Sequence, residues 1–75
     1  MGGEQEFAPG DEVEWSSHGV RVPGRVEGRI TERTRAAGRE VAASEDDPQY
    51  LVRSDKSGKK AVHRPSALTE RDRDG

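Results

Sequence analysis

Apolar and polar residues alternate along two segments of this chain, and that period of two limits its fold more than any other feature. In DEVEW (residues 11–15), Val13 and Trp15 fall on the same face. In VPGRVEGRITER (residues 22–33), one face carries Val22, Gly24, Val26, Gly28 and Ile30, and the other carries Arg25, Glu27, Arg29 and Thr31. Such alternation is typical of half-buried β-strands, so we expect strands in both places.

Glycine occupies two positions on the inward face of the second segment, Gly24 and Gly28. A strand with inward glycines can bend sharply and lets a neighbouring element approach its backbone closely. A small closed barrel requires bending of this kind. Pro23 has no backbone N–H to donate to a ladder, so we expect the start of this strand at a sheet edge or a bulge.

The rest of the chain contains further short strands separated by turn signals. The patterns QYLVRS (residues 49–54) and KKAVHR (59–64) predict two strands, and REVAAS (39–44) predicts a short one before them. Residues 34–38 are expected to form a loop or a helical turn. PSAL (65–68) is expected to form a single 3₁₀ turn whose Leu68 plugs one barrel end. Together these elements predict an all-β fold, a small five-stranded barrel.

The segment SDKSGKK (residues 54–60) joins the last two predicted strands. It differs from a Walker phosphate loop, because no glycine lies nearby upstream, Gly58-Lys59 is followed by Lys60, and a strand follows. A tight hairpin turn fits the segment better. We expect Asp55 at its first position and Gly58 at its end, with positive φ.

Composition limits the size of the core and therefore the kind of function. The chain has 75 residues, of which 28% are hydrophobic and 37% are charged. A single domain of this length buries only about 60% of its unfolded surface. We expect a core of Val13, Trp15, Val22, Val26, Ile30, Val41, Tyr50, Val52, Val62 and Leu68. So few side chains cannot build a deep substrate pocket, so we predict that the protein is not an enzyme.

The two ends of the chain differ from its middle. Residues 1–9 predict a flexible acidic N-terminal arm, residues 10–69 the barrel, and residues 70–75 a disordered C-terminal tail. The sequence has no cysteine, no apolar stretch near the roughly 18 residues of a membrane helix, and no signal-peptide pattern. Small secreted domains usually need disulfides, so we expect a cytoplasmic protein with no membrane partner.

Three short motifs make the chain resemble a known family. They are Trp-Ser-x-His-Gly at residues 15–19, Ser-Asp-Lys-Ser-Gly-Lys at 54–59 and His-x-Pro-x-x-Leu at 63–68. Over residues 10–69 the sequence is similar to the hypervirulence-associated Tudor-like domains of bacteria and fungi. The resemblance implies an SH3-like (Tudor-like) barrel and no catalytic residues. The virulence label describes a phenotype, so the family alone does not define a chemistry.

We predict neither a bound metal nor a cofactor. SEDDP (residues 44–48) offers three consecutive carboxylates, but they point in different directions, whereas calcium loops space their ligands at alternating positions. A solvated loop in which Ser44 caps one turn explains this segment better. His18 and His63 are the only histidines and no third ligand is indicated. We therefore expect a histidine hydrogen-bonded to backbone rather than a zinc site.

The residues that we consider for contact with a protein partner are Trp15, His18, Tyr50, Asp46 and Asp47. A methyl-lysine cage usually needs about three or four rings around the cation. The chain has one Phe, one Trp and one Tyr. With Phe7 in the arm and the other two rings needed for packing, we do not expect such a cage.

The residues that we consider for contact with nucleic acid are Arg25, Arg29, Lys56, Lys59 and Lys60, which cluster in two β-segments. Glu27 interrupts this set and the net charge is -2, so any such binding should be weak and non-specific. Solvation of the barrel by mixed charges is the simpler explanation. We therefore predict a monomeric, non-catalytic interaction module that binds a protein segment, with nucleic-acid binding as the alternative.

Overall fold

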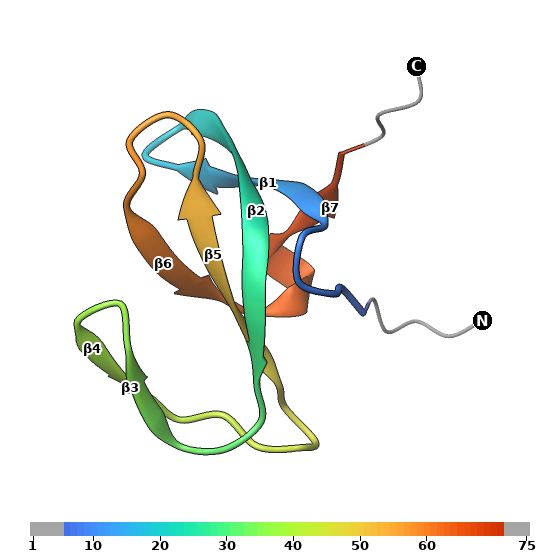
Figure 1. The fold of residues 1–75 in the computed structure, drawn as a ribbon, viewed down its shortest axis with the longest axis vertical. Helices are drawn as coiled ribbons and strands as arrows, with labels where there is room; N and C mark the ends of the chain where they lie inside the picture. The colour runs from blue at the N-terminus through green and yellow to red at the C-terminus, as the bar shows by residue number, and fades with distance from the viewer. Residues whose placement is uncertain (1–5, 72–75) are drawn as a thin grey trace.

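The computed structural model describes residues 6–71, and over this range it is all-β with a single 3₁₀ turn (Figure 1). The strands are β1 (Glu12–Ser17), β2 (Val20–Ile30), β3 (Thr34–Ala36), β4 (Arg39–Val41), β5 (Gln49–Ser54), β6 (Lys60–His63) and β7 (Thr69–Glu70). The 3₁₀ turn η1 spans Pro65–Ala67. Five strands form one antiparallel sheet in the order β6-β5-β2-β1-β7, and β3 pairs with β4 in a separate sheet.

The all-β class is confirmed, but the expected count of five strands is wrong, because residues 6–71 contain seven. Residues 34–38 form β3 and the turn after it rather than a loop or a helical turn. The short strand predicted at residues 39–44 is shorter in the structure, where β4 ends at Val41. The described strands also do not close into a hydrogen-bonded barrel. The end strands β6 and β7 each pair with one neighbour only.

Two hairpins turn on two residues with positive φ. His18 (φ 51°) and Gly19 (φ 80°) join β1 to β2, and Ala37 (φ 53°) and Gly38 (φ 77°) join β3 to β4. Positive φ at both central residues defines the type I′ turn, whose twist matches that of the flanking strands. Histidine adopts this conformation more readily than most residues, which explains His18 at the first position.

The turn between β5 and β6 is closed by Ser54. The Gly58 N–H donates to the Ser54 carbonyl oxygen (2.9 Å), and Gly58 has φ 74° as expected. The Ser54 hydroxyl oxygen accepts hydrogen bonds from the backbone N–H groups of Lys56 and Ser57, each at 3.1 Å. The turn therefore begins one residue earlier than the predicted Asp55, because a serine hydroxyl can cap a turn from its first position.

Gly24 allows Trp15 to lie directly on the backbone of β2. A Cβ atom at Gly24 would lie 2.7 Å from Cζ3 of the indole and would also overlap the carbonyl oxygen of Arg53 on β5. Val13 pairs with Gly24 across β1 and β2, and Gly24 pairs with Ser54 across β2 and β5. The sequence-based inference that an inward glycine permits close approach is therefore confirmed at Gly24.

A bulge in β2 reverses which side chains face the core. The β2–β5 register shifts between Val26 and Gly28, so Glu27 is an extra residue without a partner in β5. Inserting one residue moves every later side chain to the opposite face. Ile30 therefore does not join Val26 in the main core, and Arg29 does not share a face with Arg25, contrary to the uninterrupted alternation that the sequence suggests.

The core consists of two clusters on opposite faces of the sheet. The main cluster contains Phe7, Val13, Trp15, Val26, Tyr50, Val52 and Leu68. The second contains Val41, Ala43 and Val62, with Ile30, Ala36 and Leu51 packed against it. Leu51 lies between Tyr50 and Val52 along β5, so it points to the other face. The β3–β4 hairpin thus covers part of the outer face of the large sheet.

Phe7 belongs to the main cluster. Its side chain is only 7% exposed, and its backbone N–H donates to the Tyr50 hydroxyl oxygen at 3.1 Å. The two rings meet edge to face, with centroids 5.4 Å apart and an interplanar angle of 85°. This placement corrects the assignment of Phe7 to an arm outside the domain. Of that predicted arm, residues 1–5 lie outside the described residues.

The C-terminal part of the fold follows the predicted pattern and extends beyond it. Leu68 comes after η1 and is 4% exposed in the main cluster, as expected. The next two residues form β7, which pairs with β1, and the Arg71 N–H donates to the Glu12 carbonyl oxygen at 2.9 Å. Glu70 and Arg71 are therefore part of the fold. The rest of the predicted tail, residues 72–75, lies outside the described residues.

Across residues 6–71 there is no helix with the length and apolar character needed to cross a membrane.

We expect Gly24→Ala to destabilise the fold by about 3 kcal/mol, because the new methyl group collides with the indole and with backbone of β5. Gly28→Ala is the matched control on the same strand, where an added Cβ meets nothing within 4 Å. Chemical denaturation of both variants checks the prediction. Equal free energies of unfolding for the two variants would contradict it.

We expect Gly58→Val to lower the free energy of unfolding by about 1 kcal/mol or more, because a β-branched residue resists positive φ. The added side chain finds open space, so backbone strain alone sets the cost. Gly58→Asn is the control, since asparagine tolerates this region better. A melting temperature for Gly58→Val equal to that of the wild type would show the expectation to be wrong.

Candidate functional site

The aromatic residues suggested for partner contact lie in the core. Trp15 is 4% exposed and Tyr50 0% exposed. The Tyr50 hydroxyl group accepts the hydrogen bond from Phe7, and the Trp15 indole lies against Gly24. Neither ring faces an open cage of the kind that binds methylated lysine. Sequence reasoning missed Phe7 as the partner of Tyr50, because a lone aromatic in a polar segment carries no periodic signal.

The two histidines have different surroundings. His18 is exposed at the β1–β2 turn. His63 is half-buried near the end of β6 and lies against Trp15, with ring centroids 5.4 Å apart and an interplanar angle of 39°. Among residues 6–71, no group of three or more His, Cys, Asp or Glu side chains is placed to hold a metal ion.

Burial lowers the pKa of His63 below its ordinary value of 6.5, and the positive charge of Arg39 lowers the pKa further. Removing the imidazole from water disfavours its charged form, and a nearby cation acts in the same direction. Arg39 reaches this position from the β3–β4 hairpin, where it pairs with Ala36. Folding therefore favours the neutral form of His63.

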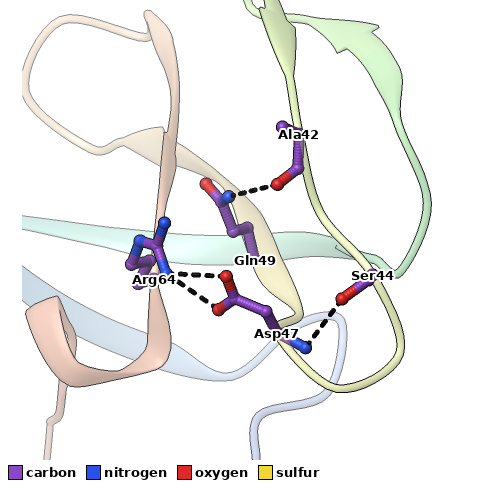
Figure 2. Close-up of polar contacts among 5 residues, drawn as sticks. All are labelled: Ala42, Ser44, Asp47, Gln49 and Arg64. Carbon is purple, nitrogen blue, oxygen red and sulfur yellow. Dashed lines mark hydrogen bonds and ion pairs between the residues drawn. The ribbon is translucent and has the colours of Figure 1, made fainter.

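The acidic loop before β5 is a closed turn pinned to the end of β6 (Figure 2). The Asp47 N–H donates to the Ser44 hydroxyl oxygen (3.1 Å) and to the Ser44 carbonyl oxygen (3.0 Å), as the predicted capping role of Ser44 requires. Arg64 Nη1 donates to both carboxylate oxygens of Asp47, each at 2.8 Å. Asp47 is therefore already paired, whereas Asp46 is exposed.

Gln49 helps to hold the same loop in place from inside. It is 6% exposed, and its side-chain nitrogen lies 3.5 Å from the Ala42 carbonyl oxygen (Figure 2). Ala42 comes directly after β4, so this contact spans the start and the end of the loop. The loop thus supports the β3–β4 hairpin, and its Asp47 carboxylate is engaged with Arg64.

Three cations line up across the outer face of the large sheet. Lys60 on β6 lies opposite Arg53 on β5, and Arg53 lies opposite Arg25 on β2. Their neighbours Ala61, Val52 and Val26 pack into the main cluster, so the charged side chains point away from it. Glu12 on β1 pairs with Arg25 and ends the row. We call Lys60, Arg53 and Arg25 the basic row.

Glu27 lies among these cations. Its carboxylate oxygens are 3.5 Å from Arg53 Nη1 and 3.5 Å from Lys60 Nζ. The two basic side chains remain 54% and 50% exposed. Partly exposed pairs at such a distance contribute about 0–1 kcal/mol each, so Glu27, whose side chain is 29% exposed, is a weakly held counter-ion. Glu27 is the extra residue of the bulge and has no register partner in β5, which leaves its side chain free to extend toward both cations.

The structure separates the five basic residues that the sequence analysis grouped together. Arg25 and Lys60 belong to the basic row, and the exposed Lys56 and Lys59 lie in or beside the adjoining β5–β6 turn. Arg29 lies on the other face beyond the bulge, opposite Tyr50. Sequence reasoning missed Arg53, which occupies the middle of the row. The register of QYLVRS against the second strand would have indicated it.

Comparison with protein families gives a match over residues 10–68 to the family described as the hypervirulence-associated proteins TUDOR domain. The chain belongs to this family. The expected membership is therefore confirmed, and the matched range covers most of the described fold. Neither a curated protein nor a solved structure matches the chain.

All three motifs that carried the resemblance contain turns in the structure. Residues 15–19 end in the type I′ turn, residues 54–59 contain the turn that Ser54 closes, and residues 63–68 contain η1. These motifs set the path of the backbone and do not supply a set of reactive side chains. They therefore identify the fold of the domain and not a chemical activity. Any binding site must therefore be sought among the surface side chains of this fold.

We expect the stability of the protein to fall as the pH is lowered from 7 to about 5.5, in part because of His63. The unfolded chain binds a proton near pH 6.5 and the folded chain only at lower pH, so the unfolded state binds more protons between these values. The stability that neutral His63 contributes is fully present above the pKa of this residue in the unfolded chain. It is lost as the pH falls through the lower pKa of His63 in the folded protein.

Thermal melts of wild type, His63→Gln and His18→Asn across this range check the prediction. His63→Gln should show a smaller loss on acidification, while His18→Asn keeps His63 and also tolerates positive φ. An identical pH dependence in wild type and His63→Gln would remove His63 as a cause.

Proposed function

We propose that this Tudor domain is a non-catalytic interaction module that binds a protein segment. The observation that carries the proposal is the family match over residues 10–68, which assigns most of the folded chain to a single Tudor domain. Domains of this size act mainly through their surface, because the core is too small to enclose a substrate.

The proposal includes an SH3-like barrel as the finer description of the fold. Three features support it. The five strands run in the order β6-β5-β2-β1-β7, a 3₁₀ turn connects the two end strands, and the long strand β2 has both a bulge and a glycine that admits Trp15. A bend of this kind brings the ends of a small sheet toward each other.

The non-catalytic part of the proposal rests on how the reactive side chains are used. The Ser44 and Ser54 hydroxyl groups cap turns, the Asp47 carboxylate accepts from Arg64, and the His63 ring lies against Trp15. Each of these groups therefore has a structural partner. Catalysis would instead require a nucleophile and a base within hydrogen-bond reach of each other.

A protein partner is favoured over nucleic acid because Phe7, Trp15 and Tyr50 are buried. Single-stranded nucleic acid is usually bound by aromatic side chains that stack on its bases. Of the residues suggested for partner contact, His18 and Asp46 are exposed and remain in the proposal. We also propose a cytoplasmic location, since the chain has no cysteine to staple a small secreted domain.

We expect the tagged domain to capture a specific protein from an extract of the native cell, with and without nuclease treatment. The captured protein, produced separately, should bind the domain in calorimetry with a 1:1 ratio. A heat-unfolded sample of the domain serves as the control and should capture nothing. Loss of all capture after nuclease treatment would contradict the protein-binding function and favour the nucleic-acid alternative.

A further inference from the structure

The outer face of the large sheet is divided into a covered part and an open part. In the covered part, Ala36 and Val41 of the β3–β4 hairpin pack against Ile30, Leu51 and Val62 of the large sheet. The part of this face beside the β5–β6 turn carries the basic row, and within residues 6–71 neither β3 nor β4 packs on it. From this division we propose that the basic row is a docking surface for an acidic, extended segment of a partner protein, a proposal that rests on the interaction function proposed above.

The geometry of the row suits a chain that crosses the strands. Neighbouring strands lie about 4.8 Å apart, so the positions of Lys60, Arg53 and Arg25 span about 10 Å. In an extended peptide, alternate side chains on one face are about 7 Å apart. Two carboxylates about 7 Å apart fall within the roughly 10 Å span of the row, so both can reach its cations at once.

Arg53 is the centre of the surface and is partly oriented before any ligand arrives. Its Nε donates to the Gly58 carbonyl oxygen at 3.3 Å, which ties the guanidinium group to the β5–β6 turn. Orienting a long side chain in advance reduces the entropy that binding would otherwise cost. Lys56 and Lys59 at the same turn add positive potential at this end of the row.

Glu27 indicates which chemical group the row accepts. Its carboxylate lies 3.5 Å from both Arg53 and Lys60, so it fills in part the place that a ligand carboxylate would take. Because both ion pairs are long and both cations are about half exposed, a partner carboxylate can displace Glu27, whose own side chain is 29% exposed. Glu27 therefore lowers the affinity of the surface for acidic segments and restricts it to partners with more than one carboxylate.

Two other occupants fit these observations less well. Nucleic acid would gain only a few phosphate contacts from a row this short, and the aromatic residues are buried. A second copy would have to place an acid-rich surface of its own on the row. The acidic residues beside the row on β1 are Glu12 and Glu14, and Glu14 already forms ion pairs with Arg21 and Arg71.

The test uses a fluorescein-labelled peptide in which glutamate alternates with threonine, titrated into the full chain and followed by fluorescence anisotropy. The control peptide has glutamine in place of glutamate. The double variant Arg53→Gln, Lys60→Gln should weaken binding about tenfold, and Glu27→Gln should strengthen it about threefold. Arg29→Gln removes an exposed arginine from the opposite face and should change the affinity by less than about twofold.

The outcomes separate this inference from the proposed function. No binding of the glutamate peptide, or equal affinity for the double variant and Arg29→Gln, overturns the docking surface. Tighter binding of a labelled oligothymidylate overturns it in favour of nucleic acid, and self-association that the double variant abolishes in sedimentation overturns it in favour of a second copy. If the double variant still captures the native protein partner at full strength, the interaction function stands and the basic row is not its site.

Discussion

The indole of Trp15 lies against bare backbone at Gly24, and the rest of the fold is built around this contact. Because Gly24 has no Cβ, the indole can lie against β2 on the main-cluster face of the sheet, and the same glycine leaves room for the carbonyl group of Arg53 on β5. The indole also lies against His63 from β6. One aromatic side chain and one missing methyl group thus connect four of the five strands of the large sheet.

The bulge at Glu27 also shapes the fold. By adding one residue to β2, it gives this strand two buried faces, one before the bulge for the main cluster and one after it for the second cluster. A domain with few apolar residues can in this way support a hairpin on the outside of its sheet. The same extra residue carries the carboxylate that reaches Arg53 and Lys60, so the shape of the core and the charge of the surface have a common origin.

Sequence patterns were sufficient where structure depends on neighbouring residues. The alternation at Val13 and Trp15, the positive φ at Gly58 and the burial of Leu68 after a 3₁₀ turn were all predictable from local sequence. Features that depend on residues far apart in the chain were not. Nothing beside Phe7 indicates that its ring would meet Tyr50, which lies 43 positions away.

The bulge shows the same limit for the candidate site. Continued alternation through Glu27 wrongly placed Arg25 and Arg29 on one face, since a register shift is visible only when the opposing strand is known. The basic row has the same origin, because cross-strand pairing rather than spacing along the chain brings Lys60 beside Arg53. Patterns along one strand therefore identify which residues are exposed, but not which of them are neighbours.

The first and the last described segments both contact the beginning of β1. The Ala8 N–H donates to the Asp11 side chain at 2.9 Å, and the Arg71 N–H donates to the carbonyl oxygen of Glu12, the next residue, also at 2.9 Å. Both segments therefore pass one corner of the fold, and this corner is well removed from the β5–β6 turn (Figure 1). A tag fused to either end of the domain would therefore start near this corner and would leave the β5–β6 turn uncovered.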